Sequence, residues 1–447
     1  MMSYRQQFHL MPETGFLNDP NGLCRFDGEY HIFHQYAPEG LSGPRGWGHV
    51  STRDFCTYHN DGMVLFPDTP FDRNGAYSGS ALTDDGQLEL SYTGNVRHSG
   101  DHDYITSGRE QNLIHTVRLP DGRFSEKKLL MTNRDYPENC SCHVRDPKVW
   151  KENGRYKMVL GARTLDNRGE ALVYDSGDKE HWTLEQVLTL PDTGYMWECP
   201  DLFSLGEKTF LCCCPQGMEP RGMEFHNIYQ SGYFPLEQGK LLPFTEFDRG
   251  FDFYAPQTFQ DGNGRRILIG WFGLPDVPYG NPSQEKEGWI HCLTLPRVLK
   301  EEGGRIIQEP LEELQGLRRD SLSLRPENGA MNILPDLHCE LAVEFDKPTE
   351  AFTLSLRQDA ILSLESGVLS LSLGASGFGR TRRSCRSGPV KQIRIFSDTS
   401  SLEIFVEGET FSTRLYESGD DTRLRFSVEA PTACTAACHL LAPFQFV

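Results

Sequence analysis

Five stretches of the chain share one layout, in which a polar or acidic motif precedes a tight turn between two apolar runs. The motifs are Asn-Asp-Pro-Asn-Gly at 18–22, Tyr-Ser-Gly-Ser at 77–80, Arg-Asp-Pro at 145–147, Trp-Glu-Cys-Pro-Asp at 197–201 and Phe-Asp-Phe-Tyr-Ala at 251–255. The turns are Asp27-Gly28, Asp85-Gly86, Asn153-Gly154, Gly206-Glu207 and Asp261-Gly262. Asp-Gly and Asn-Gly between apolar runs are strong signals for a β-hairpin, so each stretch predicts two paired strands.

The spacing of these stretches predicts how the hairpins are arranged. About eight to ten residues separate each motif from the glycine of its turn, so every motif lies at the same end of its hairpin. The turns recur at intervals of roughly 52 to 68 residues, which suits the four strands of a propeller blade. We therefore expect residues 1–300 to form a five-bladed β-propeller whose motifs meet at one central channel.

The pattern changes after residue 300. Residues 301–319 are predicted to be a linker, with a short helix over residues 310–317. Beyond it, apolar and polar residues alternate in short runs, as at 352–356 and 402–406. Short strands with one apolar face and frequent turns are typical of a β-sandwich. The chain is thus predicted to be all-β, with a β-sandwich domain over residues 320–447 after the propeller.

Charge and cysteine content narrow the partners and the compartment. The net charge of −19 argues against nucleic acid or an anionic membrane as a partner, because both require a basic face. Thirteen cysteines without an apolar leader favour reduced thiols in a cytoplasmic protein. Cys140 and Cys142 lack a second ligand pair, and the cysteines at 212–214 alternate between faces of a strand, so no metal or other cofactor is expected. The protein is expected to be a monomer or a homodimer.

Two of the motifs carry carboxyl groups suited to cleaving a glycosidic bond. That reaction needs a carboxylate and a carboxylic acid across the bond. Asp19 lies in a turn-rich segment, where backbone donors would keep it ionised. Glu198 lies between Trp197 and Cys199, an apolar setting that would favour the protonated form that a general acid needs.

Taken together, the motifs resemble those of a known enzyme family. Phe-Leu-Asn-Asp-Pro-Asn-Gly at 16–22 resembles the signature of the invertase and levanase group, family 32 of the glycoside hydrolases. Arg-Asp-Pro at 145–147 and Glu-Cys-Pro-Asp at 198–201 resemble the family's other two defining motifs, in the same order. The similarity reaches the second domain at 401–406. The resemblance implies a five-bladed propeller followed by a β-sandwich.

The resemblance also implies a role for each residue of the site. Asp19 would be the nucleophile that forms a fructosyl-enzyme intermediate, Glu198 the general acid and base, and Asp146 the stabiliser of the transition state. The implied substrate-binding residues are Asn18, Gln35, Trp47, Tyr77, Ser78, Arg145 and Trp271. The implied enzyme is a retaining β-fructofuranosidase that hydrolyses sucrose, sucrose 6-phosphate or short fructooligosaccharides.

Two other functions are compatible with parts of this pattern. A fructosyltransferase would use the same carboxyl groups and differ in whether water or a sugar reaches the intermediate. A non-catalytic fructan-binding protein would be expected to lack one of Asp19, Asp146 and Glu198, and all three are present.

The chain departs from the family pattern at the predicted rim of the pocket, which comprises Phe16, Tyr36, Ala37, Tyr77 and the loop at 40–48. Ala37 replaces a polar Asn and removes hydrogen-bonding capacity. A site that lacks a partner for a buried hydroxyl discriminates poorly for it. We therefore expect a phosphorylated sucrose or a short fructooligosaccharide to be a better substrate than sucrose.

Two groups of basic side chains remain. His31 and His34 would point to opposite faces of a strand, so at most one is expected to line the pocket. The basic cluster consists of Arg380, Arg382, Arg383, Arg386, Lys391 and Arg394. Its glycine-rich flanks favour a solvated loop, and the alternative is an interface with an acidic surface.

Overall fold

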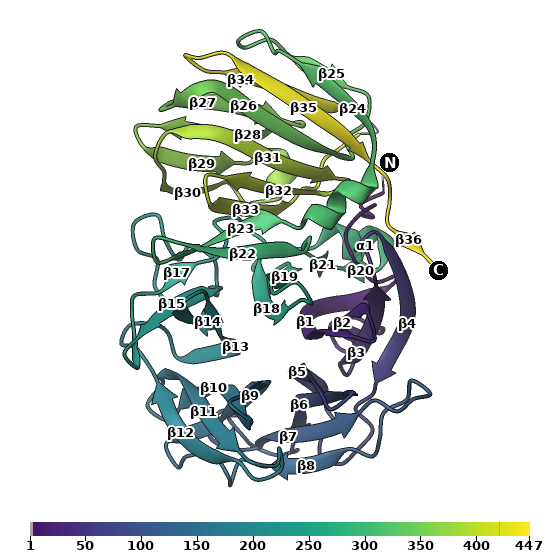
Figure 1. Ribbon diagram of the computed structural model, residues 1–447, viewed down its shortest axis with the longest axis vertical. Coiled ribbons are helices and arrows are strands. Elements are labelled where there is room, and N and C mark those ends of the chain that lie inside the picture. The colour runs from purple at the N-terminus through teal and green to yellow at the C-terminus, as the bar shows by residue number, and fades with distance from the viewer. Residues whose placement is uncertain (1–2, 420) are drawn as a thin grey trace.

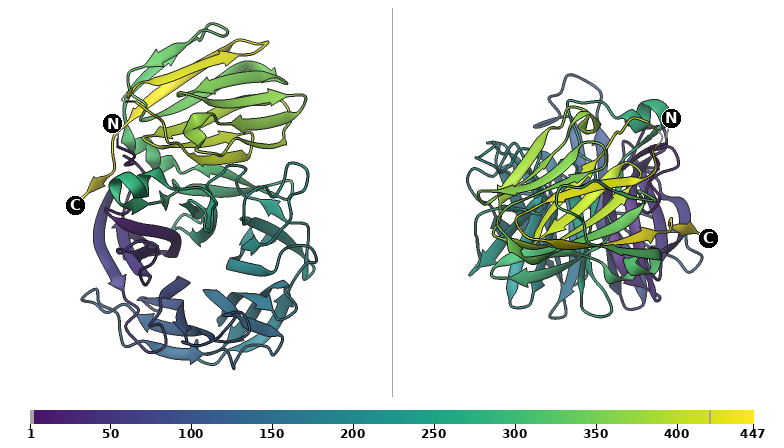
Figure 2. Two further views of the ribbon diagram at one scale, coloured as in Figure 1. Left: turned by 180° about the vertical axis from the view of Figure 1, so that it is seen from behind. Right: turned by 90° about the horizontal axis from the view of Figure 1, so that it is seen from above.

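The computed structural model describes residues 3–419 and 421–447 of the chain. Strands dominate these residues and build two parts, a ring of five sheets and a pair of packed sheets above it (Figure 1). The view from behind shows the same two parts stacked along the long axis (Figure 2). The predicted all-β fold, a five-bladed β-propeller followed by a β-sandwich, is confirmed.

Each blade of the propeller is an antiparallel sheet that begins near the centre of the ring. The first blade contains β1 (Gly15–Phe26), β2 (Glu29–Ala37), β3 (Gly46–Thr52) and β4 (Thr57–Leu65), and the second contains β5 (Ala76–Asp84), β6 (Gln87–Arg97), β7 (Arg109–Val117) and β8 (Lys128–Met131). The third contains β9 (Cys140–Glu152), β10 (Arg155–Thr164), β11 (Gly169–Ser176) and β12 (Thr183–Leu188), and the fourth contains β13 (Met196–Leu205), β14 (Lys208–Gln216), β15 (Gly232–Glu237), β16 (Lys240–Leu241) and β17 (Thr245–Glu246). The fifth contains β18 (Tyr254–Gln260), β19 (Arg266–Phe272), β21 (Cys292–Leu293), β22 (Arg297–Glu302) and β23 (Arg305–Pro310). The first strands contact one another in the order β1, β5, β9, β13, β18 and back to β1, which closes the ring.

Two short parallel pairings tie distant segments to the first blade. β20 (Trp289–Ile290), which follows the short helix α1 (Pro282–Glu287), pairs with β1. β36 (Gln445–Phe446), near the C-terminus, pairs with β4. The first blade is therefore held both by a loop of the fifth blade and by the end of the chain (Figure 1).

Three of the five predicted hairpin turns have the backbone that their sequences require. In the fifth blade the connection between β18 and β19 spans residues 261–265, and its residue with positive φ is Gly264, not Gly262. In Asp27-Gly28, Asp85-Gly86 and Asn153-Gly154 both turn residues have positive φ, between 47° and 80°. A two-residue type I′ turn needs this conformation, which glycine, asparagine and aspartate tolerate best. These turns fix the register of the first hairpin in three blades.

The register of each first strand shifts within its motif. The shifts fall between Leu17 and Pro20, Ala76 and Gly79, Arg145 and Lys148, Glu198 and Asp201, and Tyr254 and Gln257. Such bulges disrupt the ladder locally and redirect side chains. The segment that contains Asp19 is thus part of a bulged strand rather than a turn.

The fifth blade extends past the predicted domain boundary. β22 and β23 form a hairpin that pairs with β19, and it ends at Pro310. The boundary at residue 300 and the linker over 301–319 were therefore misplaced, because the polar residues of this outer hairpin resemble a linker. The short helix expected at 310–317 is a 3-10 helix, Glu312–Leu317.

The sandwich contains two six-stranded sheets. One has the order β24 (Arg318–Leu324), β35 (Cys434–Leu441), β26 (Cys339–Thr349), β31 (Val390–Asp398), β32 (Ser401–Val406) and β33 (Glu409–Arg414); the other has the order β25 (Asn332–Leu334), β34 (Leu424–Glu429), β27 (Phe352–Leu356), β28 (Ala360–Glu365), β29 (Val368–Ser372) and β30 (Arg382–Arg386). Their apolar faces form one core with Leu354, Leu362, Ile395 and Phe426 at its centre. A short 3-10 helix, Ala375–Gly377, precedes β30. Among the described residues, no helix has the length and apolar character needed to cross a membrane.

A buried ionic cluster joins the two domains. Arg297 of β22 contacts Glu403 of β32 at 2.5 Å and Asp248 at 3.1 Å. His9 lies between Asp398 and Glu403, with its ring nitrogens 2.7 Å and 3.0 Å from their carboxylate oxygens. All five side chains are fully buried. We call this group the interdomain cluster.

The basic cluster of the sandwich contributes to the same interface. Arg380 is buried and forms an ion pair with Asp252 of the propeller. Arg383 donates to the side chain of Asn227 at 2.8 Å. The solvated loop expected here is therefore wrong for these two arginines, since Arg380, just before β30, and Arg383, within β30, both contact the propeller. Asp252, in the fifth motif, faces the sandwich and not the centre of the ring.

Candidate active site

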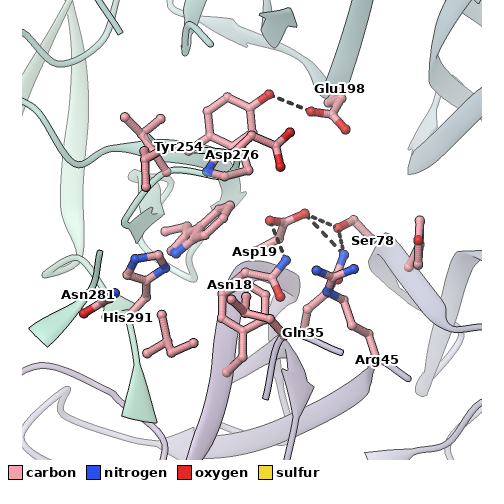
Figure 3. Close-up of a pocket in the computed structure, with 18 of the residues that line it drawn as sticks. Asn18, Asp19, Gln35, Arg45, Ser78, Glu198, Tyr254, Asp276, Asn281 and His291 are labelled. Carbon is pink, nitrogen blue, oxygen red and sulfur yellow. Dashed lines mark hydrogen bonds between the residues drawn. The ribbon is translucent and has the colours of Figure 1, made fainter. Parts of the chain in front are cut away.

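A cavity of about 660 Å³ lies where the first strands of the five blades meet. Each blade contributes a polar side chain to its wall: Asp19 from β1, Ser78 from β5, Asp146 from β9, Glu198 from β13 and Tyr254 from β18. Four of these side chains are labelled in the close-up, where they converge from different strands (Figure 3). The central channel expected from the spacing of the motifs thus exists as a pocket.

Asp19 is held entirely by neutral donors. Its Oδ1 accepts a hydrogen bond from Asn18 Nδ2 at 2.9 Å. Its Oδ2 accepts hydrogen bonds from Ser78 Oγ at 2.5 Å and from Gln35 Nε2 at 3.3 Å. Burial raises the pKa of Asp19, the hydrogen bonds from Ser78 and Asn18 partly offset this, and the nearby charge of Glu198 raises it again.

Asp146 lies in the bulge of β9, close to Asp19. Its Oδ2 accepts the backbone N–H of Cys199 at 2.9 Å, and its own N–H donates to Thr93 Oγ1 at 2.8 Å. The Cys199 thiol is 3.6 Å from Asp19 Oδ2 and 3.8 Å from Asp146 Oδ2, so one side chain touches both carboxyl groups. Burial raises the pKa of Asp146 to about 7, although Arg145 lowers it, and Glu198 adds to the rise.

Glu198 has the most polar surroundings of the three. Its Oε1 accepts two hydrogen bonds from Arg145, at 2.7 Å and 3.2 Å. Its Oε2 accepts hydrogen bonds from Tyr254 Oη at 2.6 Å and Gln216 Nε2 at 2.7 Å. The Glu198 side chain is 18% exposed, against 4% for Asp146. It is thus placed where a leaving group and water can reach it.

Gln111 and His143 hold the side chain of Arg145 in position. Its Nη1 donates to Gln111 Oε1 at 3.1 Å and to His143 Nδ1 at 2.8 Å. Burial and the charge of Arg145 lower the pKa of His143 to about 2, so His143 is neutral and accepts this hydrogen bond at Nδ1. Its Nε2 donates to the carbonyl of Tyr104 at 2.9 Å. This chain of contacts fixes the guanidinium that orients Glu198.

This arrangement provides the parts that glycosidic cleavage requires. The buried carboxyl groups of Asp19 and Asp146 lie close together, and ionising both costs free energy until a cation binds between them. A third, more accessible carboxyl group can deliver a proton to a leaving oxygen and later accept one from water. An oxocarbenium-like transition state would be stabilised by the first pair.

Most of the site residues expected from the sequence line this cavity. Besides the three carboxyl residues these are Asn18, Gln35, Tyr77, Ser78, Arg145 and Trp271. Trp47 does not. It is fully buried behind the wall, where its Nε1 donates to the carbonyl of Tyr77 at 3.0 Å. Trp47 therefore supports Tyr77 and cannot touch a ligand directly.

The expected surroundings of two carboxyl groups were wrong. Asp19 accepts side-chain rather than backbone donors, and its pKa is raised. Glu198 is surrounded by polar groups, although its sequence neighbours are apolar. In a strand, successive side chains point to opposite faces, so Trp197 and Cys199 do not form the environment of Glu198.

Several features of the predicted rim also lie elsewhere. Ala37 is fully buried and packs with Phe16 in the core beneath the pocket. Tyr36 donates to the carbonyl of Thr14 and is not part of the cavity wall. His31 hydrogen-bonds to His49 at 2.9 Å, and neither of them nor His34 lines the pocket.

The sequence interpretation missed several residues of the wall. They are Arg109, Gln216, Tyr254, Gln284, Ile290, His291 and most of the segment 274–281. Phe16 and, from the loop at 40–48, Leu41 and Arg45 were expected at the rim and do line the cavity. Tyr254 belongs to the fifth motif, two residues after Asp252. Choosing Tyr254 instead of Asp252 as the functional residue of that motif would have identified it. The segment before α1 has no repeat or motif, so it gave no signal.

Among the described residues, no group of three or more His, Cys, Asp or Glu side chains is placed to hold a metal ion. Cys140 and Cys142 are free thiols on β9.

Comparisons with known proteins agree with this geometry. The model of the glycosyl hydrolases family 32 N-terminal domain matches residues 9–310, and that of the family's C-terminal domain matches residues 321–438. A sucrose-6-phosphate hydrolase of Bacillus subtilis is 39% identical over 438 residues, which cover 92% of this chain and 89% of the relative.

Solved structures give the same result. The β-fructofuranosidase of Bombyx mori superposes with a TM-score of 0.85 at 31% identity, covering 99% of this chain and 95% of that one. The sucrose-6-phosphate hydrolase of Lactobacillus gasseri gives a TM-score of 0.87 at 27% identity, covering 98% and 93%. Both domain models and a relative of nearly full length therefore match, and the chain is a glycoside hydrolase that belongs to glycosyl hydrolase family 32.

Proposed function

We propose that this enzyme hydrolyses the β-fructofuranosidic bond of sucrose 6-phosphate and of sucrose, with retention of configuration. The observation that carries the proposal is the convergence of Asp19, Asp146 and Glu198 on one pocket. A binding protein would not need a proton donor such as Glu198 beside two costly buried carboxyl groups.

In the first step, a carboxylate oxygen of Asp19 attacks the anomeric C2 of the fructosyl unit. The bond from C2 to the glycosidic oxygen breaks, and Glu198 gives its proton to that oxygen as glucose or glucose 6-phosphate leaves. Asn18, Gln35 and Ser78 hold Asp19 in position for the attack.

In the second step, Glu198 accepts a proton from water, whose oxygen attacks C2 and releases Asp19. Asp146 stabilises the positive charge of the fructosyl ring in both transition states, because its buried carboxylate gains most when the ring is cationic. Tyr254 and Gln216 keep Glu198 oriented while its proton leaves and returns.

The similarity to sucrose-6-phosphate hydrolases from several bacteria favours the phosphorylated disaccharide over sucrose. Short fructooligosaccharides are further candidate substrates. The thirteen free cysteines support a cytoplasmic location, where thiols stay reduced.

Product analysis tests the proposal. Purified enzyme is incubated with sucrose, sucrose 6-phosphate, kestose, inulin and levan, and the products are separated over time. We expect fructose together with glucose or glucose 6-phosphate from the two disaccharides, with the phosphorylated one cleaved faster. Absence of fructose from both disaccharides would refute the proposed function.

A further inference from the structure

Two arginines of the cavity wall have no role in the steps above. Arg45 lies just before β3, and Arg109 begins β7. The Nε atoms of both are buried and have no hydrogen-bond partner among the described residues. Within residues 3–419 and 421–447, neither guanidinium forms an ion pair, whereas Arg145 in the same pocket is bound to Glu198. Neither is paired with a carboxylate, although the charge of Arg45 is close enough to lower the pKa of Asp19.

Their positions place them on one side of the pocket. The carbonyl of Arg45 accepts the N–H of Ala76, the residue before Tyr77, at 2.8 Å, and its guanidinium lies over the Phe16 ring at 5.3 Å. Arg109 lies near Tyr77 and Arg145. Both arginines therefore flank the Tyr77 segment, where the first and second blades meet.

The opposite wall has the opposite charge. It is formed by the segment before α1, where Asp276 accepts a hydrogen bond from Tyr229 at 3.0 Å. In the close-up, Arg45 and Asp276 lie on different sides of Asp19 (Figure 3). An anionic substituent would thus be attracted to the wall with Arg45 and repelled from the wall with Asp276.

We propose that Arg45 and Arg109 form the subsite for the 6-phosphate of the leaving glucose unit, an inference that rests on the proposed function. A sugar phosphate carries a charge of about −1.5 to −2 at neutral pH and offers three acceptor oxygens. Guanidinium groups match such oxygens in bidentate geometry better than any other side chain. The unused Nε–H groups are the donors that such a contact needs.

The local electrostatics favour an anion at this place. Burial lowers the pKa of Arg109; Tyr77 partly offsets this, and the charges of Arg145 and Arg97 lower it further. A bound phosphate would supply the compensating negative charge. A neutral sugar unit would supply hydrogen bonds but no charge, so a trisaccharide such as kestose gains less from this wall.

Paired kinetics test the subsite. The kcat/KM values for sucrose 6-phosphate and for sucrose are measured with wild-type enzyme and with Arg45→Gln, Arg109→Gln and both changes together. The ratio of the two values should fall by roughly 10- to 100-fold in each single variant and further in the double variant. Lys at either position should restore part of the ratio, because it keeps the charge without the bidentate geometry.

Arg97→Gln is the matched control. Arg97 pairs with Arg109 in the β6–β7 register but stacks on Tyr104 at 4.3 Å and is not part of the wall. Its ratio should fall much less than that of Arg109→Gln, because the change removes a nearby charge but no donor of the wall. Turnover of sucrose by each variant reports whether the pocket is intact, and calorimetric binding of glucose 6-phosphate against glucose reports the subsite independently of turnover.

The outcomes separate the two proposals. If wild-type enzyme cleaves neither disaccharide, the proposed function fails, and glucose 6-phosphate binding still decides the subsite. If both disaccharides are cleaved but the variants lose activity on both equally, or kestose suffers the selective loss, the phosphate subsite is refuted and the function stands. No preference of the wild-type enzyme for sucrose 6-phosphate would also overturn it.

Discussion

The interdomain cluster and the active-site pocket both bury several carboxyl groups close together, but they differ in how far cationic partners compensate the negative charge. In the interdomain cluster, Asp398 and Glu403 share His9, and Glu403 also binds Arg297. Burial raises the pKa of each, but these cationic partners more than offset the effect, and the pKa values of both are lowered.

In the active-site pocket, compensation is incomplete. Asp19 accepts hydrogen bonds from neutral donors only, and the charge of Arg45 offsets little of its burial. The nearest cation to Asp146 is Arg145 at 3.8 Å, which is already bound to Glu198. Burial therefore dominates, and the pKa values of Asp19 and Asp146 are raised. A buried carboxylate with a full set of partners holds domains together, whereas one that lacks a cation is prepared to receive one from the substrate.

The strongest test of this difference replaces one carboxylate of the pocket. Asp19→Asn keeps the size and removes the nucleophile, so turnover of sucrose should fall by roughly four orders of magnitude or more. Thermal unfolding should occur at the wild-type temperature or above, since an uncompensated buried charge is removed. A variant with near wild-type turnover, or one that unfolds well below the wild type, would contradict this account.

The same change in the interdomain cluster should have the opposite effect. Glu403→Gln leaves Arg297 and His9 without their shared anion, so unfolding should become easier by about 3 kcal/mol. Glu309→Gln is the control, because its pair with Lys300 is half-exposed and should contribute less than about 1 kcal/mol. Equal unfolding midpoints for the two variants would show that the buried ion pairs of Glu403 stabilise the protein no more than an exposed ion pair does.

The sequence predicts the fold of this protein better than it predicts the surroundings of its buried charges. The turns and the spacing of the motifs are local signals, and the five blades and the three carboxyl residues could be inferred from them. The fifth motif shows the limit: Asp252 lies before β18 and pairs with Arg380 of the sandwich, so Tyr254, two residues later, lines the pocket instead. Neither Trp47, behind the wall, nor Arg380, between the domains, could be placed without tertiary contacts.

A smaller effect is expected from a neutral donor in the pocket. Tyr254→Phe removes the hydrogen bond to Glu198 Oε2 but leaves Arg145 and Gln216 in place. One hydrogen bond to a charged group is worth about 1.5–3 kcal/mol, so kcat/KM for sucrose should fall at least about 10-fold. An activated leaving group should recover part of this loss. Wild-type kinetics would mean that Tyr254 does not position Glu198.

The last effect concerns the pH dependence of stability and is small within any single pH unit. The pKa of Asp146 is raised, so the stability it contributes is complete below its unfolded value of about 3.9 and is lost as pH rises towards about 7. The pKa of Asp398 is lowered, so its contribution is lost as pH falls. Asp146→Asn should therefore become more stable relative to wild type between pH 4 and pH 8, by at most about 1.4 kcal/mol per unit. Unfolding midpoints that differ by a constant amount at all pH values would argue against it.

The central claim is that Asp19 becomes covalently bound to the substrate, and peptide mass spectrometry tests it most directly. In Glu198→Gln, a fructosyl fluoride can still react, because its leaving group needs no proton, while the second step lacks its base. The fructosyl-enzyme should accumulate and add the mass of one anhydrofructose unit to the peptide that contains Asp19. An adduct on the peptide that contains Asp146, or turnover without any adduct, would contradict the account.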